Sequence, residues 1–336
     1  MAEIGIAFQT DKAPGRYGQL AAAAEAHGFD VVSVFADLLY QPPQPALLEM
    51  AHATARVRLG AACLNPYTQH PYEIAGALAA LDAASGGRAY LGLARGAWLD
   101  VIGIAQRHPL GHLRDTAAIV RALLSGDDRG YAGTAYRLAP GTRLRYPATP
   151  AARDGRMPPL LLGAWGPRGA ALAGEIADEL KVGGSANPAV VPMIRDRIAD
   201  GARLAGRNPD AVTIVLGAVT VVDEDGPAAR RLARTEVAKY LAVVADLDPA
   251  GPLPGALAGR VRELVAAGRD DDAGALIPDE VLDRFAFSGT PGHVAALAQR
   301  VLNAGVGRID FGGPHGLDDA GGVDLLGTAV LPRLRR

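Results

Sequence analysis

Hydrophobic and polar positions along the chain follow two alternating patterns. Short apolar runs, of which IGIAF and VVSVFA come first, predict buried strands, because a strand covered on both faces is apolar throughout. Between these runs, apolar residues recur at helical spacing, as in RYGQLAAAAEAH. The chain is therefore predicted to alternate strand and helix along its length.

Eight strands are predicted, over residues 4–9, 31–36, 57–64, 89–94, 159–162, 179–182, 212–222 and 307–311. Helices are predicted over residues 16–27, 45–55, 71–84, 113–124, 168–177, 189–204, 228–244, 257–267 and 291–303. Gly28 is expected to end the first helix, and Pro71 suits the first turn of the third. Eight strands separated by helices favour an α/β fold, a closed (β/α)8 TIM barrel, over an open sheet. We expect one domain over residues 1–336.

Two segments interrupt the alternation. Residues 127–156, rich in Gly, Pro, Arg and Tyr, predict an irregular insertion or a short hairpin after the fourth helix. Residues 246–286 follow the seventh strand and its helix and include Pro249, Pro252 and Pro254. Because the loops after barrel strands line the active face, this second insertion could be a mobile lid. A surface segment with helices of its own is the alternative.

Composition and charge narrow the class of protein. The chain has 34 Lys and Arg against 36 Asp and Glu, a net charge of −2, which gives no electrostatic case for nucleic acid or an anionic membrane as partner. The single cysteine, Cys63, rules out an internal disulfide and suits a reducing cytosol. No apolar run is long enough for a membrane span, and the first residues read as a strand rather than a leader. We expect a soluble, cytoplasmic protein.

Several common catalytic and metal motifs are absent from the sequence. There is no HExxH or CxxC, and no GxSxG elbow or Walker A loop. His108 and His112 are four residues apart, but Pro109 and Gly111 argue against a regular helix there. We therefore expect no metal site, and acyl-transfer and P-loop phosphoryl-transfer chemistry lose support.

The glycine-rich turn GAWGPRG, residues 163–169, is the strongest candidate for an anion site. It follows the fifth strand and opens a helix, whose N-terminal N–H groups and dipole favour negative charge. Arg168 could add a positive charge, and Gly183 and Gly184 could close the other side. A tight connection without a ligand is the alternative, although the end of a barrel strand favours a site. The spacing is not GxGxxG, so no dinucleotide site is implied.

Polar residues follow other strands at the same predicted face. Asp37 ends the second strand and could orient a ligand or relay a proton, or it could be a helix cap or a solvated loop acid. His70 precedes Pro71 and could simply cap the third helix. His315, in GGPHG, could contact substrate or donate a proton, or be a surface histidine.

Two tryptophans and the cysteine complete the set of candidates. Trp98 and Trp165 could wall a flat ligand, or each could pack a loop. Cys63 is interpreted as a small core residue rather than a nucleophile.

Three stretches resemble the luciferase-like superfamily, and within it the F420-dependent methylenetetrahydromethanopterin reductase branch. They are NPYTQHP, LDAASGGRAYLGLARGAWLD and LLLGAWGPRGAALAGEIADELKVG. The resemblance runs from EIGIAF to DFGGPHG, nearly the whole chain. It implies that the C-terminal mouth of the barrel holds coenzyme F420 or, alternatively, FMN.

The resemblance also implies site residues. A non-proline cis peptide bond is expected in the third strand, at Ala62–Cys63 or Cys63–Leu64. The implied cofactor contacts are Asp37, Ala62, Cys63, Leu64, Asn65, Arg95, Gly96, Ala97, Gly163, Ala164, Trp165, Gly166, Pro167, Arg168, Gly183 and Gly184. The candidate catalytic residues are Asp37, His70, Gln9 and His315.

The sequence departs from the family pattern at two positions. Leu38 follows Asp37 where many F420 enzymes have histidine, and Ala7 replaces an acidic residue of the methanogen reductases. These differences disfavour methylenetetrahydromethanopterin as the substrate.

Three functions are consistent with the resemblance. The first hypothesis is an F420-dependent oxidoreductase that transfers a hydride between the deazaflavin C5 and a small organic substrate. The alternatives are an FMN-dependent monooxygenase using reduced flavin and oxygen, and a catalytically degenerate flavin-binding protein. The resemblance also implies a homodimer.

Overall fold

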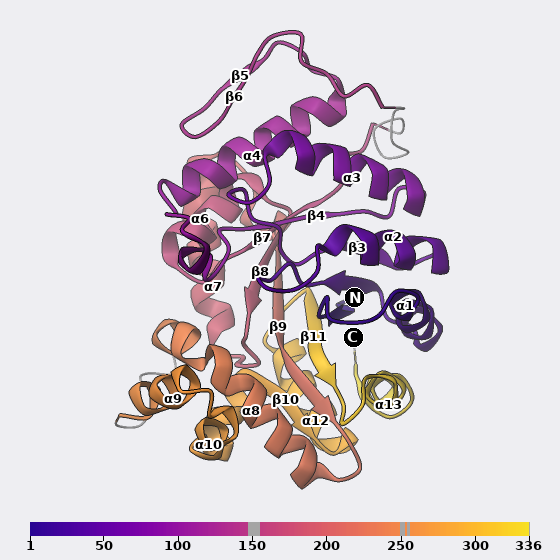
Figure 1. Cartoon of the computed structure of the whole chain (residues 1–336), viewed down its shortest axis with the longest axis vertical. Coiled ribbons are helices and arrows are strands. Elements are labelled where there is room, and N and C mark those ends of the chain that lie inside the picture. The colour runs from indigo at the N-terminus through magenta and orange to yellow at the C-terminus, as the bar shows by residue number, and fades with distance from the viewer. Residues whose placement is uncertain (147–154, 249–252, 254–255, 336) are drawn as a thin grey trace.

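Eight parallel strands form a closed barrel in the computed structural model, which describes residues 1–146, 155–248, 253 and 256–335 (Figure 1). The strands run in the order β3-β2-β1-β11-β9-β8-β7-β4. Bridges Leu59–Ala89 and Leu64–Leu93 join β3 to β4 and close the ring. The predicted (β/α)8 barrel is confirmed. The strands are β1 (Glu3–Phe8), β2 (Val31–Val34), β3 (Arg58–Ala61), β4 (Leu91–Ala94), β7 (Leu160–Gly163), β8 (Glu179–Gly183), β9 (Thr213–Val222) and β11 (Arg308–His315).

Helices cover the outer face of the barrel (Figure 1). They are α1 (Arg16–His27), α2 (Pro43–Ala53), α3 (Pro71–Ser85), α4 (Pro109–Ser125), α6 (Pro167–Ile176), α7 (Val190–Leu204), α12 (Pro291–Asn303) and α13 (Asp319–Leu325). Gly28 caps α1 in the left-handed conformation, and Pro71 begins α3, as predicted. The large apolar core lies between these helices and the outward faces of the strands.

The start of α4 corrects one prediction. The helix begins at Pro109 and includes both Gly111 and His112. Proline is tolerated in the first turn because its missing N–H would have no partner inside the helix there. The prediction that Pro109 and Gly111 exclude a helix at His112 was therefore wrong.

The third strand carries the predicted irregularity. Between the two bridges to β4, the β3 side advances from Leu59 to Leu64 while the β4 side advances from Ala89 to Leu93. The β3 side thus holds one extra residue, which defines a bulge. Within it the Ala62–Cys63 peptide bond is cis, at one of the two places that the resemblance implied.

The first insertion contains a short hairpin, β5 (Tyr131–Ala132) and β6 (Arg137–Leu138). Asp115 on α4 anchors it by accepting hydrogen bonds from Ala135 N at 2.6 Å, Tyr136 N at 3.0 Å and Tyr131 OH at 2.9 Å. Figure 1 shows the hairpin at one end of the molecule. Residues 147–154 of this predicted insertion lie outside the described residues.

The second insertion is helical and has an apolar core of its own. It comprises α8 (Gly226–Val244), η3 (Ala245–Leu247), α9 (Leu257–Ala266), α10 (Asp270–Ala275), α11 (Asp279–Phe285) and β10 (Ala286–Gly289). Within the described residues this arrangement matches the alternative of a segment with its own helices. The motion of a lid remains a prediction, and Pro249, Pro252 and Pro254 lie outside the described residues.

The strand β10 extends the barrel wall. It pairs in parallel with Val219–Val222 of β9, whereas β8 pairs with the earlier part of β9, up to Gly217. At about 3.3 Å per residue, the wall continues past the end of β8 by roughly 13 Å. Sequence reasoning missed β10, because its four residues, AFSG, carry little periodic signal.

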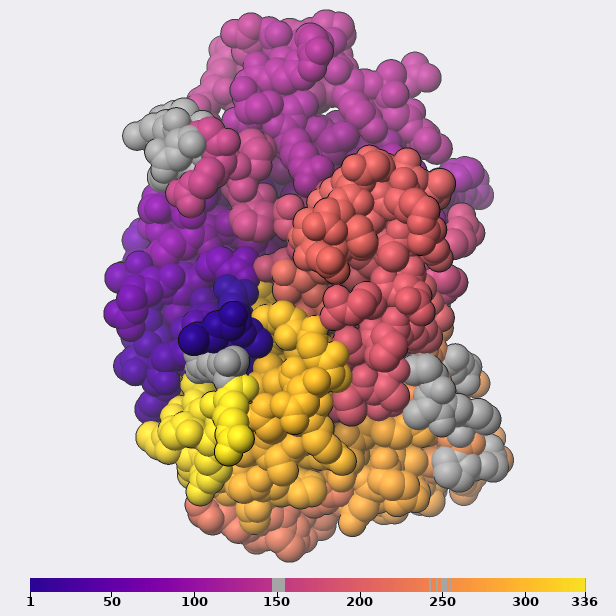
Figure 2. All heavy atoms as spheres, turned by 180° about the vertical axis from the view of Figure 1, so that it is seen from behind, coloured from indigo at the N-terminus to yellow at the C-terminus, as the bar shows by residue number. Residues whose placement is uncertain are grey.

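Near the two ends of the chain, α1 and α13 lie side by side (Figure 1). Figure 2 shows the first residues of the chain (indigo) from behind, beside its C-terminal part (gold to yellow). His27 of α1 contacts Asp324 of α13 with its Nε2 2.9 Å from the carboxylate Oδ1. Gly327 leaves room for His27, because a Cβ there would lie 2.1 Å from the ring Cγ. The C-terminal segment thus closes over α1 and completes the ring of helices.

Candidate active site

Six charged side chains lie along the barrel interior below its C-terminal mouth. They are Glu3, Arg58, Glu179, Lys181, Arg308 and Asp310, which makes three acids and three bases. Successive partners lie close together: Arg58 to Glu179 at 2.8 Å, Glu179 to Arg308 at 2.7 Å, Arg308 to Asp310 at 3.0 Å and Asp310 to Lys181 at 2.7 Å. This interior charge column is neutral overall, which limits the cost of burying its charges.

Glycines on neighbouring strands make room for the column. A Cβ at Gly5 would lie 2.1 Å from Asp310 Oδ1, and one at Gly217 would lie 3.0 Å from Lys181 Cε. Burial by itself would raise the pKa of the Asp310 carboxyl. The positive charges of Arg308 and Lys181 have a larger, opposite effect and hold that pKa below its usual value. Asp310 is therefore an anion at neutral pH.

Asp37 and Gln9, which follow β2 and β1, contact each other. Gln9 Nε2 donates to Asp37 Oδ2 at 2.9 Å. The Asp37 side chain is exposed to solvent. Many protein atoms nevertheless lie around its carboxyl, and the resulting desolvation raises the pKa of that group. The hydrogen bond from Gln9 and the charge of Lys181 lower the pKa, but by less than desolvation raises it. An accessible carboxylate with a raised pKa suits proton exchange with a ligand.

The turns after β3 and β4 contact each other. Asn65 Oδ1 accepts from Tyr67 N at 3.1 Å and Thr68 N at 3.0 Å, which fixes the first turn. A Cβ at Gly96 would lie 3.0 Å from Asn65 Cβ. Gln106 Nε2 donates to the carbonyls of Arg95 at 2.5 Å and Gly96 at 2.9 Å. Sequence reasoning missed Gln106, which lies in an irregular loop without a motif.

The Gly163–Gly169 region opens α6 beside the end of β8. Trp165 Nε1 donates to Gly183 O at 2.6 Å, which ties the two glycine turns together. Arg197, on α7, donates to Trp165 O at 2.8 Å and was also missed, because its helix gave no motif. These contacts agree with the role of Trp165 in packing a loop, and its predicted contact with a cofactor stays a prediction.

This region fits the anionic group of a cofactor. The N-cap residue of α6, Gly166, provides no side-chain cap for the first N–H groups of the helix. A Cβ at Gly166 or Gly183 would meet no atom within 4 Å. Open space next to an uncapped helix N-terminus is where a phosphate binds favourably. Pro167 and Arg168 in the first turn are exposed, and Ala164 is half-buried.

The bulge residues line the inner side of the mouth. Ala62 and Leu64 are buried and Cys63 is half-buried. A Cβ at Gly163 would lie 3.1 Å from Cys63 Sγ, so the bulge approaches the start of the Gly163–Gly169 turn closely. Burial raises the pKa of the Cys63 thiol to about 12. The thiol is protonated at neutral pH, in agreement with a packing role rather than a nucleophilic one.

Two of the candidate histidines have structural roles. His70 is the N-cap of α3: its Nδ1 accepts from Tyr72 N at 3.1 Å, and its ring lies edge-on to Tyr136. His315 is 1 % exposed, and its ring centroid lies 4.9 Å from that of Phe8. Desolvation lowers the pKa of His315 to about 4, so the ring is neutral. In this conformation its burial keeps it from a ligand at the mouth.

The rim of the mouth carries exposed apolar side chains. Trp98, 48 % exposed, follows β4 just after Ala97, and Val101 and Ile102 are exposed in the same loop. Leu39 and Tyr40 are exposed after β2. These residues offer an apolar border around Asp37, compatible with a flat or apolar ligand.

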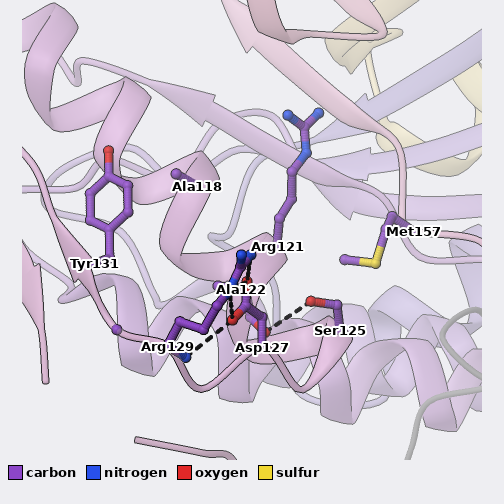
Figure 3. A pocket seen from close by; sticks show the side chains of 9 residues that line it. Ala118, Arg121, Ala122, Ser125, Asp127, Arg129, Tyr131 and Met157 are labelled. Atoms are coloured by element: carbon purple, nitrogen blue, oxygen red, sulfur yellow. Dashed lines mark hydrogen bonds and ion pairs between the residues drawn. The ribbon is translucent and has the colours of Figure 1, made fainter. Parts of the chain in front are cut away.

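A pocket of about 570 Å³ lies elsewhere, between the end of α4 and the β5 strand (Figure 3). Its polar side chains have partners within the protein: Arg121 donates to Ile176 O at 2.8 Å, and Arg129 pairs with Asp127. None of the residues that line this pocket is a candidate site residue, and we assign the pocket no role. Among the described residues no group of His, Cys, Asp and Glu could hold a metal ion, and no helix could cross a membrane.

Comparisons with known proteins agree with this geometry. The model of the family described as luciferase-like monooxygenase matches residues 2–308. A 5,10-methylenetetrahydromethanopterin reductase of Methanolobus tindarius is 29 % identical, over 98 % of this chain and 99 % of its own. An F420-dependent glucose-6-phosphate dehydrogenase of Nakamurella multipartita is 29 % identical, over 96 % of this chain and 93 % of its own.

A solved structure supports the same relation. The coenzyme F420-dependent tetrahydromethanopterin reductase of Methanopyrus kandleri superposes with a TM-score of 0.89 at 25 % identity. The alignment covers 99 % of this chain and 99 % of that one. The similarity therefore includes the insertions as well as the barrel.

Proposed function

The chain belongs to the luciferase-like monooxygenase family, and from that premise we propose that it is a coenzyme F420-dependent oxidoreductase acting on a small organic molecule. The observation that carries the proposal is the full-length similarity to F420-dependent reductases and dehydrogenases. Bound F420 supplies hydride exchange at the C5 carbon of its deazaflavin ring.

The chain provides residues that fit such a cofactor. The open backbone at Gly166 and the uncapped start of α6 suit its phosphate, with Arg168 in the same turn. The bulge at Ala62–Leu64 would hold the ring, and the backbone at Gly96, next to Asn65, would lie near the cofactor tail. Trp165, fixed by Gly183 and Arg197, keeps the phosphate turn in place.

Asp37 is the residue we assign to the proton. Its Oδ2 is held by Gln9, and desolvation raises the pKa of its carboxyl above the usual value, which favours proton exchange. An alcohol that loses a hydride also loses its hydroxyl proton, and the Asp37 carboxylate can accept that proton. In the reverse direction the Asp37 carboxyl donates it. Gln9 orients the carboxylate and leaves the other oxygen for substrate.

The substrate is proposed to differ from methylenetetrahydromethanopterin. Ala7 and Leu38 stand where an acid and a histidine are expected in related enzymes. The apolar rim formed by Leu39, Tyr40 and Trp98 favours an uncharged organic molecule.

An FMN-dependent monooxygenase is the second candidate, favoured by the description of the matching family. The two functions differ in cofactor, because deazaflavin does not activate oxygen as flavin does. A degenerate binding protein is the third, favoured by the absence of a histidine after Asp37.

A binding titration tests the proposal. The purified protein is titrated with F420 and, separately, with FMN, and a turnover assay with a panel of small alcohols and carbonyl compounds uses the tighter ligand. We expect F420 to bind at micromolar or lower concentration and to be reduced or oxidised. Binding of FMN alone would overturn the F420 assignment in favour of the monooxygenase. Binding of F420 without turnover would favour the degenerate protein.

We also propose that the protein is a homodimer in the cytoplasm. The family resemblance supports the dimer, and the single cysteine supports a reducing compartment. Light scattering after size exclusion should give about twice the chain mass of 34.6 kDa. A mass of one chain at micromolar concentration would contradict the dimer.

A further inference from the structure

Phe35 follows β2 and continues the alternation of its side chains. The Phe35 N–H donates to Phe8 O at 2.9 Å, so the pairing with β1 continues past the last residue of β2. Side chains two residues apart on an extended strand point the same way, so Ser33, Phe35 and Asp37 share one face. Ser33 lies inside the barrel, where its hydroxyl bonds that of Tyr90 at 2.7 Å. The Phe35 ring is therefore directed into the barrel, one step below Asp37.

The Phe35 ring crosses the barrel interior. Its centroid lies 5.8 Å from Nζ of Lys181, on β8. In the closed ring of strands, β8 is four strands from β2 in either direction, so these two side chains come from opposite walls. The tip of the ring lies against β11, because a Cβ at Gly312 would be 3.5 Å from Phe35 Cζ. Phe35 thus spans the interior from β2 to the walls formed by β8 and β11.

The two sides of the ring have different surroundings. On one side lies Lys181, the last member of the interior charge column, whose side chain is 7 % exposed. Phe35 itself is half-buried, so part of it is open to solvent. Because the column fills the space on the Lys181 side, the open part of Phe35 faces the mouth. Phe35 is therefore the floor of the mouth, with paired charges below it and Asp37 above it.

The space between this floor and Asp37 is shallow. Two residues of extended chain rise by roughly 7 Å, which separates the level of Phe35 from that of Asp37. Apolar atoms in contact lie about 3.5–4 Å apart, so a gap of this height holds about one layer of ligand atoms. The floor also offers no free cation, because Asp310 Oδ2 lies 2.7 Å from Lys181 Nζ and neutralises it.

We propose that Phe35 is a specificity-determining residue, on whose ring the carbon skeleton of the substrate lies. The inference rests on the proposed function and deepens it. It names the substrate class as uncharged alcohols and carbonyl compounds whose carbon skeleton is small or flat. The substrate oxygen faces Asp37, and the carbon skeleton is removed from water by contact with Phe35. A longer or bulkier skeleton does not fit between the two residues.

The first test measures how substrate size affects turnover. With F420 as cofactor, kcat/KM is determined for 2-propanol and 2-heptanol, or for acetone and 2-heptanone in the reverse direction. The variants are Phe35→Leu and Phe35→Ala. The ratio of kcat/KM, long chain over short, should rise from the parent to Phe35→Leu and further in Phe35→Ala, by roughly tenfold or more, as expected when a fitted apolar pocket is enlarged.

Two readouts separate this role from others. The affinity for F420 should stay within about threefold of the parent in both variants, because Phe35 is assigned to the substrate. A lower F420 affinity with an unchanged size ratio would assign Phe35 to the cofactor and overturn the inference. If Phe35→Ala does not fold, Phe35→Leu provides the same comparison.

Phe29→Leu is the matched control for Phe35→Leu. Phe29 precedes β2, at the end of the strand away from the mouth, and is 4 % exposed in the apolar core outside the barrel. The substitution should lower the free energy of unfolding and leave the size ratio unchanged. An equal change of the ratio in Phe29→Leu would show that general loosening is responsible and would overturn the role of Phe35.

A labelling experiment tests the floor without any substrate. The chain has three lysines, Lys12, Lys181 and Lys239. The protein is treated with sulfosuccinimidyl acetate, and mass spectrometry follows acetylation of Lys181 relative to Lys239, whose side chain is 45 % exposed. This relative rate should rise by roughly tenfold or more in Phe35→Ala, because protection of a buried group depends on its access to solvent. An unchanged rate, or an equal rise in Phe29→Leu, would overturn the floor.

Failure of the inference and failure of the proposed function give different results. If F420 does not bind, or binds without turnover of any alcohol or carbonyl compound, the proposed function falls and the substrate class with it. Turnover with a size ratio that the Phe35 variants leave unchanged rejects the inference alone.

Discussion

Candidate residues at the mouth and near it differ in how deeply their side chains are buried, and burial influences whether each side chain carries a charge. Asp37 is accessible, and its carboxyl is held by one amide, whereas His315 is enclosed and neutral. Both were candidates from sequence because both follow a barrel strand. A side chain that follows a strand can point into the mouth or away from it, and the sequence pattern alone does not distinguish these directions. The geometry favours Asp37.

Replacing Asp37 with Asn should separate function from stability. The raised pKa of Asp37 means that the folded protein holds this proton more tightly than the unfolded chain, so ionisation of the carboxyl disfavours folding as pH rises. Asp37→Asn should therefore leave the melting temperature at pH 7 equal or higher, while turnover falls by 10²-fold or more. Thermal unfolding and steady-state kinetics measure the two effects. A large loss of stability with little loss of turnover would assign Asp37 to structure.

His315 predicts a distinct dependence of stability on pH. Its pKa is about 4 in the folded protein and about 6.5 when unfolded, so the unfolded chain binds the extra proton between these values. Stability should fall as pH drops from about 6.5 to about 4, by roughly 3 kcal/mol from this one group. Denaturant unfolding at several pH values gives the slope.

The matched variant for this slope is His315→Asn. Residue 315 has a φ of 78°, which asparagine tolerates better than other residues with a Cβ. The variant should have lower stability at pH 7 and a flatter profile over the same pH window. An unchanged slope would show that other groups carry the acid sensitivity.

Elements were predicted well where a long periodic pattern existed, as for α1 and α12, whose bounds agree with the prediction. The short helices α10 and α11 were missed, because six or seven residues hold less than two full turns of pattern. Gln106 and Arg197 could not be found for another reason. Each acts by donating to a backbone carbonyl, an interaction that depends on tertiary position rather than on neighbouring sequence.

The start of α6 gives a test of the anion site. Gly166→Glu places a carboxylate in the open space at this helix N-terminus, where it would repel a phosphate and fill its place. Cofactor affinity should fall at least 100-fold, while circular dichroism and melting temperature change little. Fluorescence titration measures the affinity.

Gly292→Glu is the matched control for this test. Gly292 lies in the first turn of α12, and a Cβ there also meets no atom within 4 Å. Its replacement should leave cofactor affinity unchanged. Equal binding by Gly166→Glu and the parent would refute the phosphate turn.

The molecule as a whole packs its barrel interior with charge and small residues. Most barrels fill this space with layers of branched aliphatic side chains. Here Gly60 faces Tyr90, whose hydroxyl bonds Ser33 at 2.7 Å, and the charge column occupies the space beside them. The sequence predicted eight strands but not this interior, because EIGIAF and GRIDFGG do not show which partners their charged residues meet across the barrel.

Gly60→Ala tests this interior packing. The added Cβ would lie 2.6 Å from the Tyr90 ring, so the ring must move within a filled space. The free energy of unfolding should fall by roughly 1–3 kcal/mol, as for other overpacked cores. Chemical denaturation with urea measures it.

Gly76→Ala is the opposite case within the same chain. Gly76 lies inside α3, and a Cβ there meets no atom within 4 Å. The free energy of unfolding should rise by about 0.5–1 kcal/mol, because alanine favours the helix. A similar effect of both substitutions would contradict the steric argument.

The pairing of β10 with β9 makes the barrel wall higher on the β8 side of the mouth than on the opposite side. On the β8 side the sheet continues past the phosphate turn, and Tyr240 of α8 packs on Gly184, with 2.9 Å between the ring and the place of a Cβ. On the β2 and β4 side the strands end in short loops that carry Leu39 and Trp98. Under the proposed function, we expect a substrate to approach from the lower side, across the exposed apolar side chains of Leu39 and Trp98. Such a route would favour molecules with an apolar surface among those that reach Asp37.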